Sequence, residues 1–362
     1  MKKHLHNSLR ALFLSLAVLL SLPMQGEKVE IGGINYELNT KVKHASVIAK
    51  SSGKYSGDVV ISESVEHEGT VYSVTSIGDS AFYKCSGLIS ITIPNSVNKI
   101  GNEAFSFCSG LSTVHIFDIA AWCNIDFVAY YSHPFNWADH LYMNGEEVKD
   151  LVIPNSVTSI KDYAFLDCKA LTSVTIPSSV KSIGECAFSG CKGLTSVSIP
   201  NSVKSIGGLA FSRCYGLTSV TIGNSVKSIG DGAFQFCNAL NSVTIGSCVT
   251  SIGWSTFANC SELLDVYCYA ENVPSTESSA FNGSHPEYAT LHVPAASIDS
   301  YKATEPWNRF GKIVALTPEE TSIDELKSED GKVKTAVYDL SGRRVQNAQK
   351  GIFIRDGKVV VK

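Results

Sequence analysis

Hydrophobic and polar positions along this chain repeat with a period of 23 residues. Seven copies of one phrase lie between residues 77 and 270, and one of them reads IGECAFSGCKGLTSVSIPNSVKS. Four apolar positions recur in register, namely the isoleucines Ile77, Ile100, Ile160, Ile183, Ile206, Ile229 and Ile252, the phenylalanines Phe82, Phe105, Phe165, Phe188, Phe211, Phe234 and Phe257, the cysteines Cys85, Cys108, Cys168, Cys191, Cys214, Cys237 and Cys260, and the leucines Leu88, Leu111, Leu171, Leu194, Leu217, Leu240 and Leu263. A fixed period of this length is typical of a solenoid, in which one small unit stacks on copies of itself.

Each copy contains two stretches that predict extended backbone. Residues 171–177, LTSVTIP, alternate apolar and polar side chains, which is typical of a half-buried strand with Ser173 and Thr175 facing outward. The final proline ends this strand because it has no N–H to donate to a neighbour. Residues 180–183, VKSI, suit a turn or a short second strand. The segment 184–191 suits one helical or 3₁₀ turn that places its phenylalanine in the core.

One repeat of this size cannot bury its own apolar side, whereas several stacked repeats can. Successive coils align their strands about 4.8 Å apart, so phenylalanine would lie above phenylalanine and leucine above leucine. We therefore predict a β-rich α+β solenoid with a parallel strand stack over residues 77–270. The ends of such a stack need caps. We expect a β-rich cap at residues 27–76, with a hairpin turn at Glu68-Gly69, and a degenerate last repeat with a helical cap at residues 271–315.

The repeated motif Leu-x-x-Val-x-Ile-Pro-x-Ser-Val-x-x-Ile-Gly-x-x-Ala-Phe-x-x-Cys resembles the BspA-like leucine-rich repeats, a class of bacterial surface proteins. The resemblance covers roughly residues 27–315. It implies a right-handed leucine-rich-repeat solenoid, extracellular display and adhesion to host or bacterial partners. It implies no catalytic residues.

An insertion interrupts the period between the second and third copies, at residues 117–150. Four of its aromatic residues are candidate binding residues, namely Trp122, Tyr130, Tyr131 and Trp137. Asn144-Gly145 predicts a hairpin, and we expect the insertion to loop out on one face of the solenoid. Its aromatic rings either cover a local core or form a ligand-contact site, since aromatic side chains are favoured at binding hot spots.

The two ends of the chain predict export. Residues 1–26 contain Lys2, Lys3 and Arg10 followed by the apolar run 11–22, which is typical of a signal peptide and too short to span a bilayer. No transmembrane segment is expected in the mature chain. Residues 316–331 have the composition of an acidic linker. Residues 332–362 have strand signals separated by glycine turns and resemble a type IX secretion sorting domain.

Composition and charge exclude several classes of function. The formal net charge is −4, so nucleic-acid binding is not expected. Seven of the eleven cysteines belong to the repeat register, where cysteine acts as a small buried apolar residue, so we expect free buried thiols. No Cys-x-x-Cys pair and no His-Glu-x-x-His motif is present, and we expect neither a metal, nor a cofactor, nor catalysis.

The outer strand positions and a row of lysines are the candidate binding face. The hydroxyl residues are Ser173, Thr175, Ser196, Ser198, Ser219, Thr221, Ser242 and Thr244, and the lysines are Lys181, Lys204 and Lys227. Like charges spaced by one coil repel one another, so these lysines must face water. They either match an acidic partner or keep the solenoid soluble.

These observations favour an exported, adhesin-type protein that binds extracellular or host-surface proteins. One alternative is a structural envelope or surface-layer element. Another is a carbohydrate-binding module that stacks the aromatic rings of the insertion on sugars.

Overall fold

The computed structural model describes residues 26–317, residue 320 and the backbone of four short strands nearer the C-terminus. The chain divides into two compact units, residues 1–314 and residues 315–362, and each is described by itself. The predicted signal peptide, apart from Gly26, and most of the predicted acidic linker lie outside the described residues.

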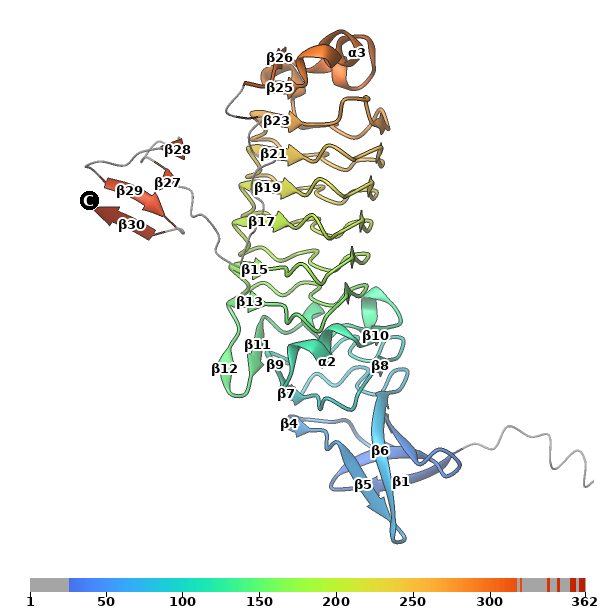
Figure 1. Ribbon diagram of the computed structural model, residues 1–362. Coiled ribbons are helices and arrows are strands. Elements are labelled where there is room, and N and C mark those ends of the chain that lie inside the picture. Colours follow the sequence, from blue (N-terminus) through green and yellow to red (C-terminus); the bar gives the residue numbers. More distant parts are fainter. Residues whose placement is uncertain are drawn as a thin grey trace, which may run out of the picture. The chain divides into compact units, whose positions relative to one another are not determined.

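The first unit is a stack of coils in which each regular coil contributes one longer and one two-residue strand (Figure 1). In the C-terminal half the longer strands form a six-stranded sheet of β17 (Ser196–Ile199), β19 (Ser219–Ile222), β21 (Ser242–Ile245), β23 (Asp265–Cys268), β25 (Thr290–Val293) and β26 (Lys312–Ala315). The two-residue strands form a second sheet of β14 (Ser159–Ile160), β16 (Ser182–Ile183), β18 (Ser205–Ile206), β20 (Ser228–Ile229), β22 (Ser251–Ile252) and β24 (Ser275–Thr276). β13 (Asp150–Val152) pairs with β15 (Ser173–Thr175) below the first of these sheets.

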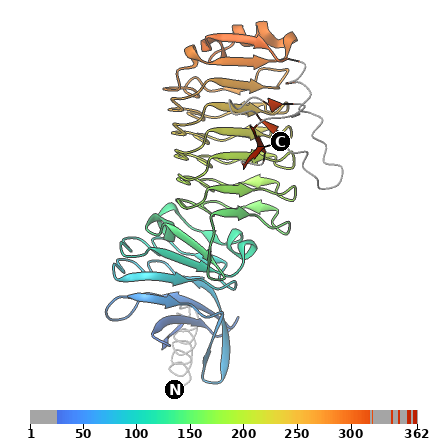
Figure 2. The ribbon, with the colours of Figure 1, turned by 90° about the vertical axis from the view of Figure 1, so that its left-hand side faces the viewer.

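Strand pairing in this half follows the sequence period. Ser196 pairs with Ser219 and Ile183 with Ile206, in parallel and 23 residues apart. Figure 2 shows the longer strands lying one above another. The predicted repeat solenoid with a parallel strand stack is therefore confirmed.

Two further sheets build the N-terminal half. One contains β1 (Glu27–Ile31), β2 (Ile34–Asn39), β3 (His44–Ile48), β6 (Thr70–Ile77), β8 (Lys99–Ile100) and β10 (Asp126–Phe127), with β5 (Ser64–His67) paired to β6. The other contains β4 (Gly57–Val60), β7 (Leu88–Thr92), β9 (Thr113–Ile116), β11 (His140–Met143) and β12 (Glu146–Glu147). The expected hairpin at Glu68-Gly69 joins β5 to β6, and both of its turn residues have positive φ, as a type I′ turn requires.

The core consists of the recurring apolar residues, all of which are buried. Neighbouring phenylalanine rings stack with centroids 5.1 to 5.6 Å apart and planes within 10° of parallel, from Phe82 to Phe105 and again from Phe165 to Phe281. The thiols add a polar contact that the sequence did not indicate. Cys214 Sγ donates to the Phe188 carbonyl of the preceding coil at 3.2 Å, and four other repeat cysteines do the same.

The segment between the two-residue strand and the next longer strand differs from the predicted helical or 3₁₀ turn. It consists of hydrogen-bonded turns, and two residues in each regular coil have left-handed backbone. One of them lies three residues after the recurring isoleucine, and we call this the third position; its residues are Ser80, Glu103, Tyr163, Cys186, Leu209, Gly232 and Ser255. The other lies seven residues after the isoleucine, and we call this the seventh position; its residues are Lys84, Phe107, Asp167, Gly190, Arg213, Phe236 and Asn259. Residues of left-handed conformation cannot continue a right-handed helical turn, so the helical prediction was wrong.

The insertion does not loop out of the stack, which corrects a second expectation. Its β10 continues the sheet of β8, and its β11 pairs in parallel with β9. Between them lie α2 (Ile119–Cys123) and the 3₁₀ turns η1 (Tyr130–Ser132) and η2 (Pro134–Asn136). The insertion is therefore an enlarged coil. It ends in the predicted Asn144-Gly145 hairpin, which joins β11 to β12.

The last coils pack under a helical segment. It contains η3 (Pro286–Tyr288), η4 (Ala295–Ser297), α3 (Ile298–Ala303) and η5 (Trp307–Arg309). Trp307 and Phe310 contact the ring of Phe281, which is the final member of the phenylalanine ladder. In the second unit, β27 (Val337–Tyr338), β28 (Arg344–Val345), β29 (Ile352–Arg355) and β30 (Lys358–Val361) form an antiparallel sheet in the order β28-β27-β29-β30.

Candidate functional site

The outward hydroxyls of the longer strands form two straight columns. Parallel pairing places Ser196 beside Ser219 and Ser198 beside Thr221, and Ser242 and Thr244 continue the two columns. Val197 between them is buried, as the alternation predicted. Of the eight candidate hydroxyl residues, Ser173, Thr175, Ser196, Ser198 and Thr221 are exposed, while Ser219, Ser242 and Thr244 are half-buried.

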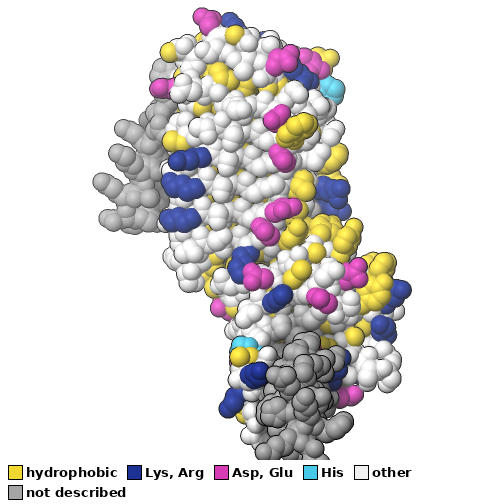
Figure 3. Space-filling view, turned by 90° about the vertical axis from the view of Figure 1, so that its right-hand side faces the viewer, with side chains coloured by type: hydrophobic (Ala, Val, Ile, Leu, Met, Phe, Trp, Pro, Cys, Tyr) yellow, Lys and Arg dark blue, Asp and Glu magenta, His cyan; other side chains and the backbone are white. Residues whose placement is uncertain are grey.

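The three candidate lysines form a column of their own. The Lys204 N–H donates to the Lys181 carbonyl at 2.8 Å, and the Lys227 N–H donates to the Lys204 carbonyl at 2.9 Å. All three side chains are exposed, and in the described part of the chain none of them forms an ion pair. Figure 3 shows a column of basic side chains along the upper coils.

A turn separates the lysine column from the hydroxyl columns. In one coil this turn is at residues 201–202, between the strand β17 and Lys204, which directly precedes β18. The structure therefore places the two sets on neighbouring faces and does not merge them into one site. A partner would have to wrap around this corner to contact both sets.

Glycine allows the coils to approach each other closely enough to keep these columns straight. Gly207 follows the recurring Ile206, and a Cβ atom at this glycine would lie 2.5 Å from the carbonyl carbon of Gly184 in the preceding coil. Gly184, Gly230 and Gly253 are equally crowded by the preceding coil. Only glycine fits at this coil-to-coil contact.

The aromatic residues of the insertion divide between core and surface. Trp122 is buried, and its Nε1–H donates to the Ala164 carbonyl of the next coil at 2.7 Å. Tyr131 is 64% exposed, whereas Tyr130 and Trp137 are half-buried. Trp122 therefore joins the two halves of the stack and is not available to stack on a sugar.

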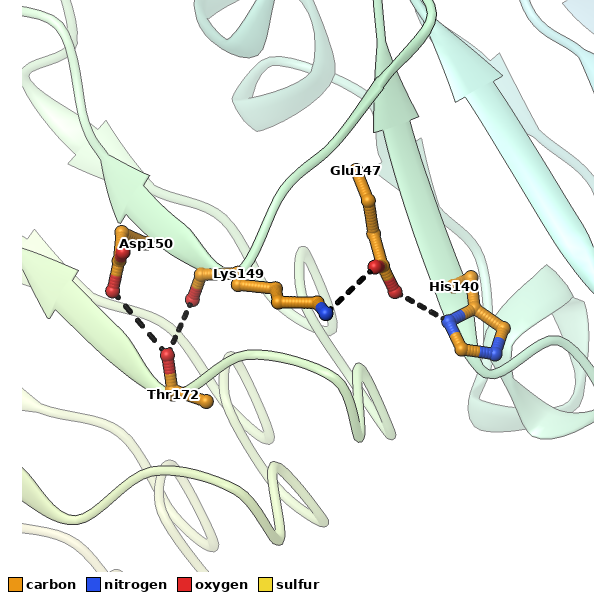
Figure 4. A network of polar contacts seen from close by, with 5 residues as sticks. All are labelled: His140, Glu147, Lys149, Asp150 and Thr172. Carbon is orange, nitrogen blue, oxygen red and sulfur yellow. Dashed lines mark hydrogen bonds and ion pairs between the residues drawn. The ribbon is translucent and has the colours of Figure 1, made fainter.

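The junction between the enlarged coil and the next coil is rich in polar contacts. Figure 4 shows Glu147 between His140 and Lys149, with Oε1 2.5 Å from His140 Nδ1 and Oε2 3.0 Å from Lys149 Nζ. Thr172 donates to the Lys149 carbonyl and to Asp150 Oδ1 in the same view. The side-chain hydrogen bonds to His140 and Lys149 lower the pKa of Glu147. These contacts connect the hairpin of the insertion to β13 and β15, which indicates a structural role.

One carboxylate at this junction is held in an unfavourable environment. Tyr130 donates from its hydroxyl to Asp167 Oδ2 at 3.1 Å. Burial raises the pKa of Asp167, although the Tyr130 hydrogen bond and the cations Lys169, Lys192 and Arg213 act to lower it. Burial likewise raises the pKa of Tyr130 to about 12. The negative charge of Asp167 is therefore less stable here than in water.

The cysteines form no disulfides, and the buried ones are not reactive thiol sites. All eleven are free, and only Cys248 is exposed. Burial raises the pKa of repeat thiols such as Cys108, Cys214 and Cys260 to about 12. A thiol with a raised pKa is a poor nucleophile. Within the described residues no group of three His, Cys, Asp or Glu side chains is arranged to hold a metal ion.

Sequence analysis missed an aromatic and basic cluster near the N-terminal end. It contains Tyr83, Phe107 and Trp137 with Lys54 and Lys84, and we call it the Phe107 cluster. Phe107 is 55% exposed. A signal was present in the sequence, because most residues in register with Phe107 are polar or glycine, such as Lys84 and Gly190, although Phe236 shares the position.

The fold and these surfaces define a non-globular class of protein, the strand-rich repeat solenoid with an extended exposed face. A family model described as "BspA type Leucine rich repeat region" matches six copies over residues 63–126, 137–264 and 191–302. The chain belongs to this BspA-type leucine-rich-repeat family. In the described residues, no helix is both long enough and apolar enough to cross a membrane.

Solved structures with similar folds are leucine-rich-repeat proteins of bacteria. One from Bacteroides ovatus is 23% identical with a TM-score of 0.52, and the match covers 80% of this chain and 76% of that one. A leucine-rich cell surface protein from Faecalibacterium prausnitzii is 24% identical with a TM-score of 0.39, covering 83% and 98%. A T. pallidum leucine-rich-repeat protein is 25% identical with a TM-score of 0.37, covering 66% and 91%. A search of curated proteins finds no match.

Proposed function

We propose that this chain is an exported, adhesin-type protein that binds other proteins through the outer face of its longer strands and carries out no chemistry. The observation that carries the proposal is the pair of in-register hydroxyl columns, whose uncharged side chains are exposed or half-buried over successive coils. Such a face offers many hydrogen-bonding groups at a regular spacing. Family membership supports the same reading, because repeat solenoids use extended surfaces for binding.

The lysine column gives this proposal a second, electrostatic component. Three ammonium groups on neighbouring coils, none of them in an ion pair within the described residues, attract an acidic partner and increase its association rate. The proposed exported location accords with the predicted signal peptide and with the resemblance of the tail to a sorting domain.

Binding of the full chain to an array of purified extracellular-matrix and host-surface proteins tests the proposal. Saturable binding to at least one of them is expected. Thr221→Arg should weaken it by placing a long charged side chain in the centre of the face. Asn238→Arg is the matched control, because it adds the same charge at an exposed turn of a neighbouring coil. Absence of saturable binding, or equal loss in both variants, would contradict the proposal.

A further inference from the structure

The three rings of the Phe107 cluster come from three consecutive coils. The ring centroid of Phe107 lies 5.7 Å from that of Tyr83 in the preceding coil and 6.4 Å from that of Trp137 in the enlarged coil. Tyr83 and Trp137 are half-buried, whereas more than half of the Phe107 side chain is exposed. Two partly buried rings thus support a third ring that projects into solvent.

The backbone at Phe107 makes this arrangement costly. Phe107 occupies the seventh position of its coil with φ 61°, where a bulky residue is strained by about 1–3 kcal/mol. Gly190 and Asn259 occupy this position in other coils and tolerate the left-handed region. Phe236 also occupies it, but that ring is half-buried. Core packing does not explain Phe107, because its ring is exposed. A strained, exposed aromatic side chain points to a role at the surface.

Two cations lie at this cluster, and one of them, Lys84, lies against the projecting Phe107 ring. Lys84 Nζ lies 5.1 Å from the Tyr83 ring and 6.0 Å from the Phe107 ring. Lys54 Nζ lies 5.9 Å from the Tyr83 ring and donates to the Tyr83 carbonyl at 2.8 Å. Among the described residues neither lysine has an acidic partner within ion-pair distance. Figure 3 shows hydrophobic and basic side chains gathered along one edge of the lower coils.

The ring geometry decides which ligand fits. The planes of Tyr83 and Phe107 meet at 87°, and those of Phe107 and Trp137 at 38°. Successive sugar rings stack on aligned flat faces, which this cluster does not provide. A single projecting ring instead suits an apolar recess on a partner, and the unpaired lysines suit carboxylates around that recess.

We propose that the Phe107 cluster docks an acidic protein segment, with Phe107 packing against an apolar side chain of that segment and Lys54 and Lys84 pairing with its carboxylates. This inference rests on the proposed protein-binding role, but it assigns the contact to a turn edge and not to the strand face. It commits to a peptide partner over a carbohydrate.

Selection of a random phage-displayed peptide library on the full chain tests the proposal. Enriched peptides should carry Asp or Glu around an apolar residue. Phe107→Asn should weaken binding of the synthetic consensus peptide about tenfold or more, as loss of a hot-spot side chain does, and Lys84→Glu should weaken it further at low salt. Phe107→Asn should keep the fold, because Asn259 occupies the same position in another coil, and thermal unfolding checks this.

Lys192→Glu is the matched control, because Lys192 lies over the exposed Tyr215 ring in the same way, at 5.5 Å, and it should leave binding unchanged. Enriched peptides that are basic, or that bind Phe107→Asn as well as the wild type, would overturn the proposal. If the wild type bound an oligogalacturonate and Phe107→Asn did not, the choice of a peptide partner over a carbohydrate would be overturned. If Thr221→Arg lost binding to the extracellular-matrix or host-surface protein while Phe107→Asn kept it in full, this site would be rejected and the proposed function would stand.

Discussion

The repeat cysteines are buried and also hydrogen-bonded. Five of the seven repeat thiols donate to the phenylalanine carbonyl of the preceding coil, as Cys237 Sγ does to Phe211 at 3.2 Å. In the degenerate last repeat Ser284 replaces the cysteine, and its hydroxyl donates to the Phe257 carbonyl in the same way. The position therefore requires a small side chain that can donate a hydrogen bond to the coil below.

Substitution of one of these thiols should distinguish hydrogen bonding from packing. Cys214→Ala removes both the donor and some volume, and we expect the free energy of unfolding to fall by about 1–3 kcal/mol. Cys214→Ser keeps a donor, as Ser284 does, and should lose less. Urea unfolding monitored by circular dichroism measures both variants. Equal losses would show that the thiol contributes through packing alone.

Asp167 provides a test of electrostatics at the junction. Because burial raises its pKa, the folded chain binds a proton at this carboxylate more tightly than the unfolded chain does. Through this group, the free energy of unfolding of the wild type therefore increases as the pH falls. Asp167→Asn removes the buried charge and keeps an acceptor for the Tyr130 hydroxyl. We expect a small increase in the free energy of unfolding at pH 7. This advantage should shrink on acidification, and an advantage that grows would contradict the sign of the pKa shift.

At the scale of elements, two adjacent glycines have different roles. A Cβ atom at Gly207 would collide with backbone of the preceding coil, whereas one at Gly208 would lie 3.4 Å from the Asp231 carbonyl, an ordinary contact. Gly207→Ala should therefore destabilise by about 1–3 kcal/mol or more, because the coils must separate. Gly208→Ala should be neutral or should stabilise by about 0.4–1 kcal/mol through the unfolded state. Comparison of their thermal unfolding midpoints tests this pair, and similar midpoints would contradict it.

The strands and the core could be predicted from the sequence because the same apolar side chains recur at the same positions in each repeat. The turns could not, because left-handed backbone occurs there at residues as different as Leu209 and Arg213, which have no preference for it. The enlarged coil was missed because His140 follows its strand partner Thr113 by 27 residues and not by 23. Phe127 then pairs with the recurring Ile100 without matching the phrase.

The candidate surfaces were predictable to a similar extent. Alternation along the strands placed Ser198 and Thr221 outward, and the structure places them so. The burial of Trp122 depends on a contact with Ala164, 42 residues later in the chain, and no local pattern reveals such a contact.

At the scale of the whole molecule, the regular coils of the first unit behave as interchangeable layers. Deletion of residues 196–218 joins Thr195 to Ser219, which pairs with Ser196 in the native stack. We expect this variant to fold, with a smaller denaturant m-value because less surface is exposed on unfolding. Deletion of residues 196–206, about half a coil, is the control and should prevent folding because it breaks the register. Failure of both variants to fold would show that the coils are not equivalent.

The left-handed third and seventh positions affect how such a protein can evolve. Their backbone is held by bonds between coils, such as that from Arg213 N–H to the Gln235 carbonyl at 2.8 Å, and not by the side chain. At the exposed members of these positions, such as Phe107 and Arg213, a mutation exchanges one surface group for another while the ladders inside remain as they were. Glycine at every such position would relieve the backbone strain but would leave the solenoid without side chains at these positions. The strain that Phe107 and Arg213 impose is the cost of a surface that can acquire new partners one residue at a time.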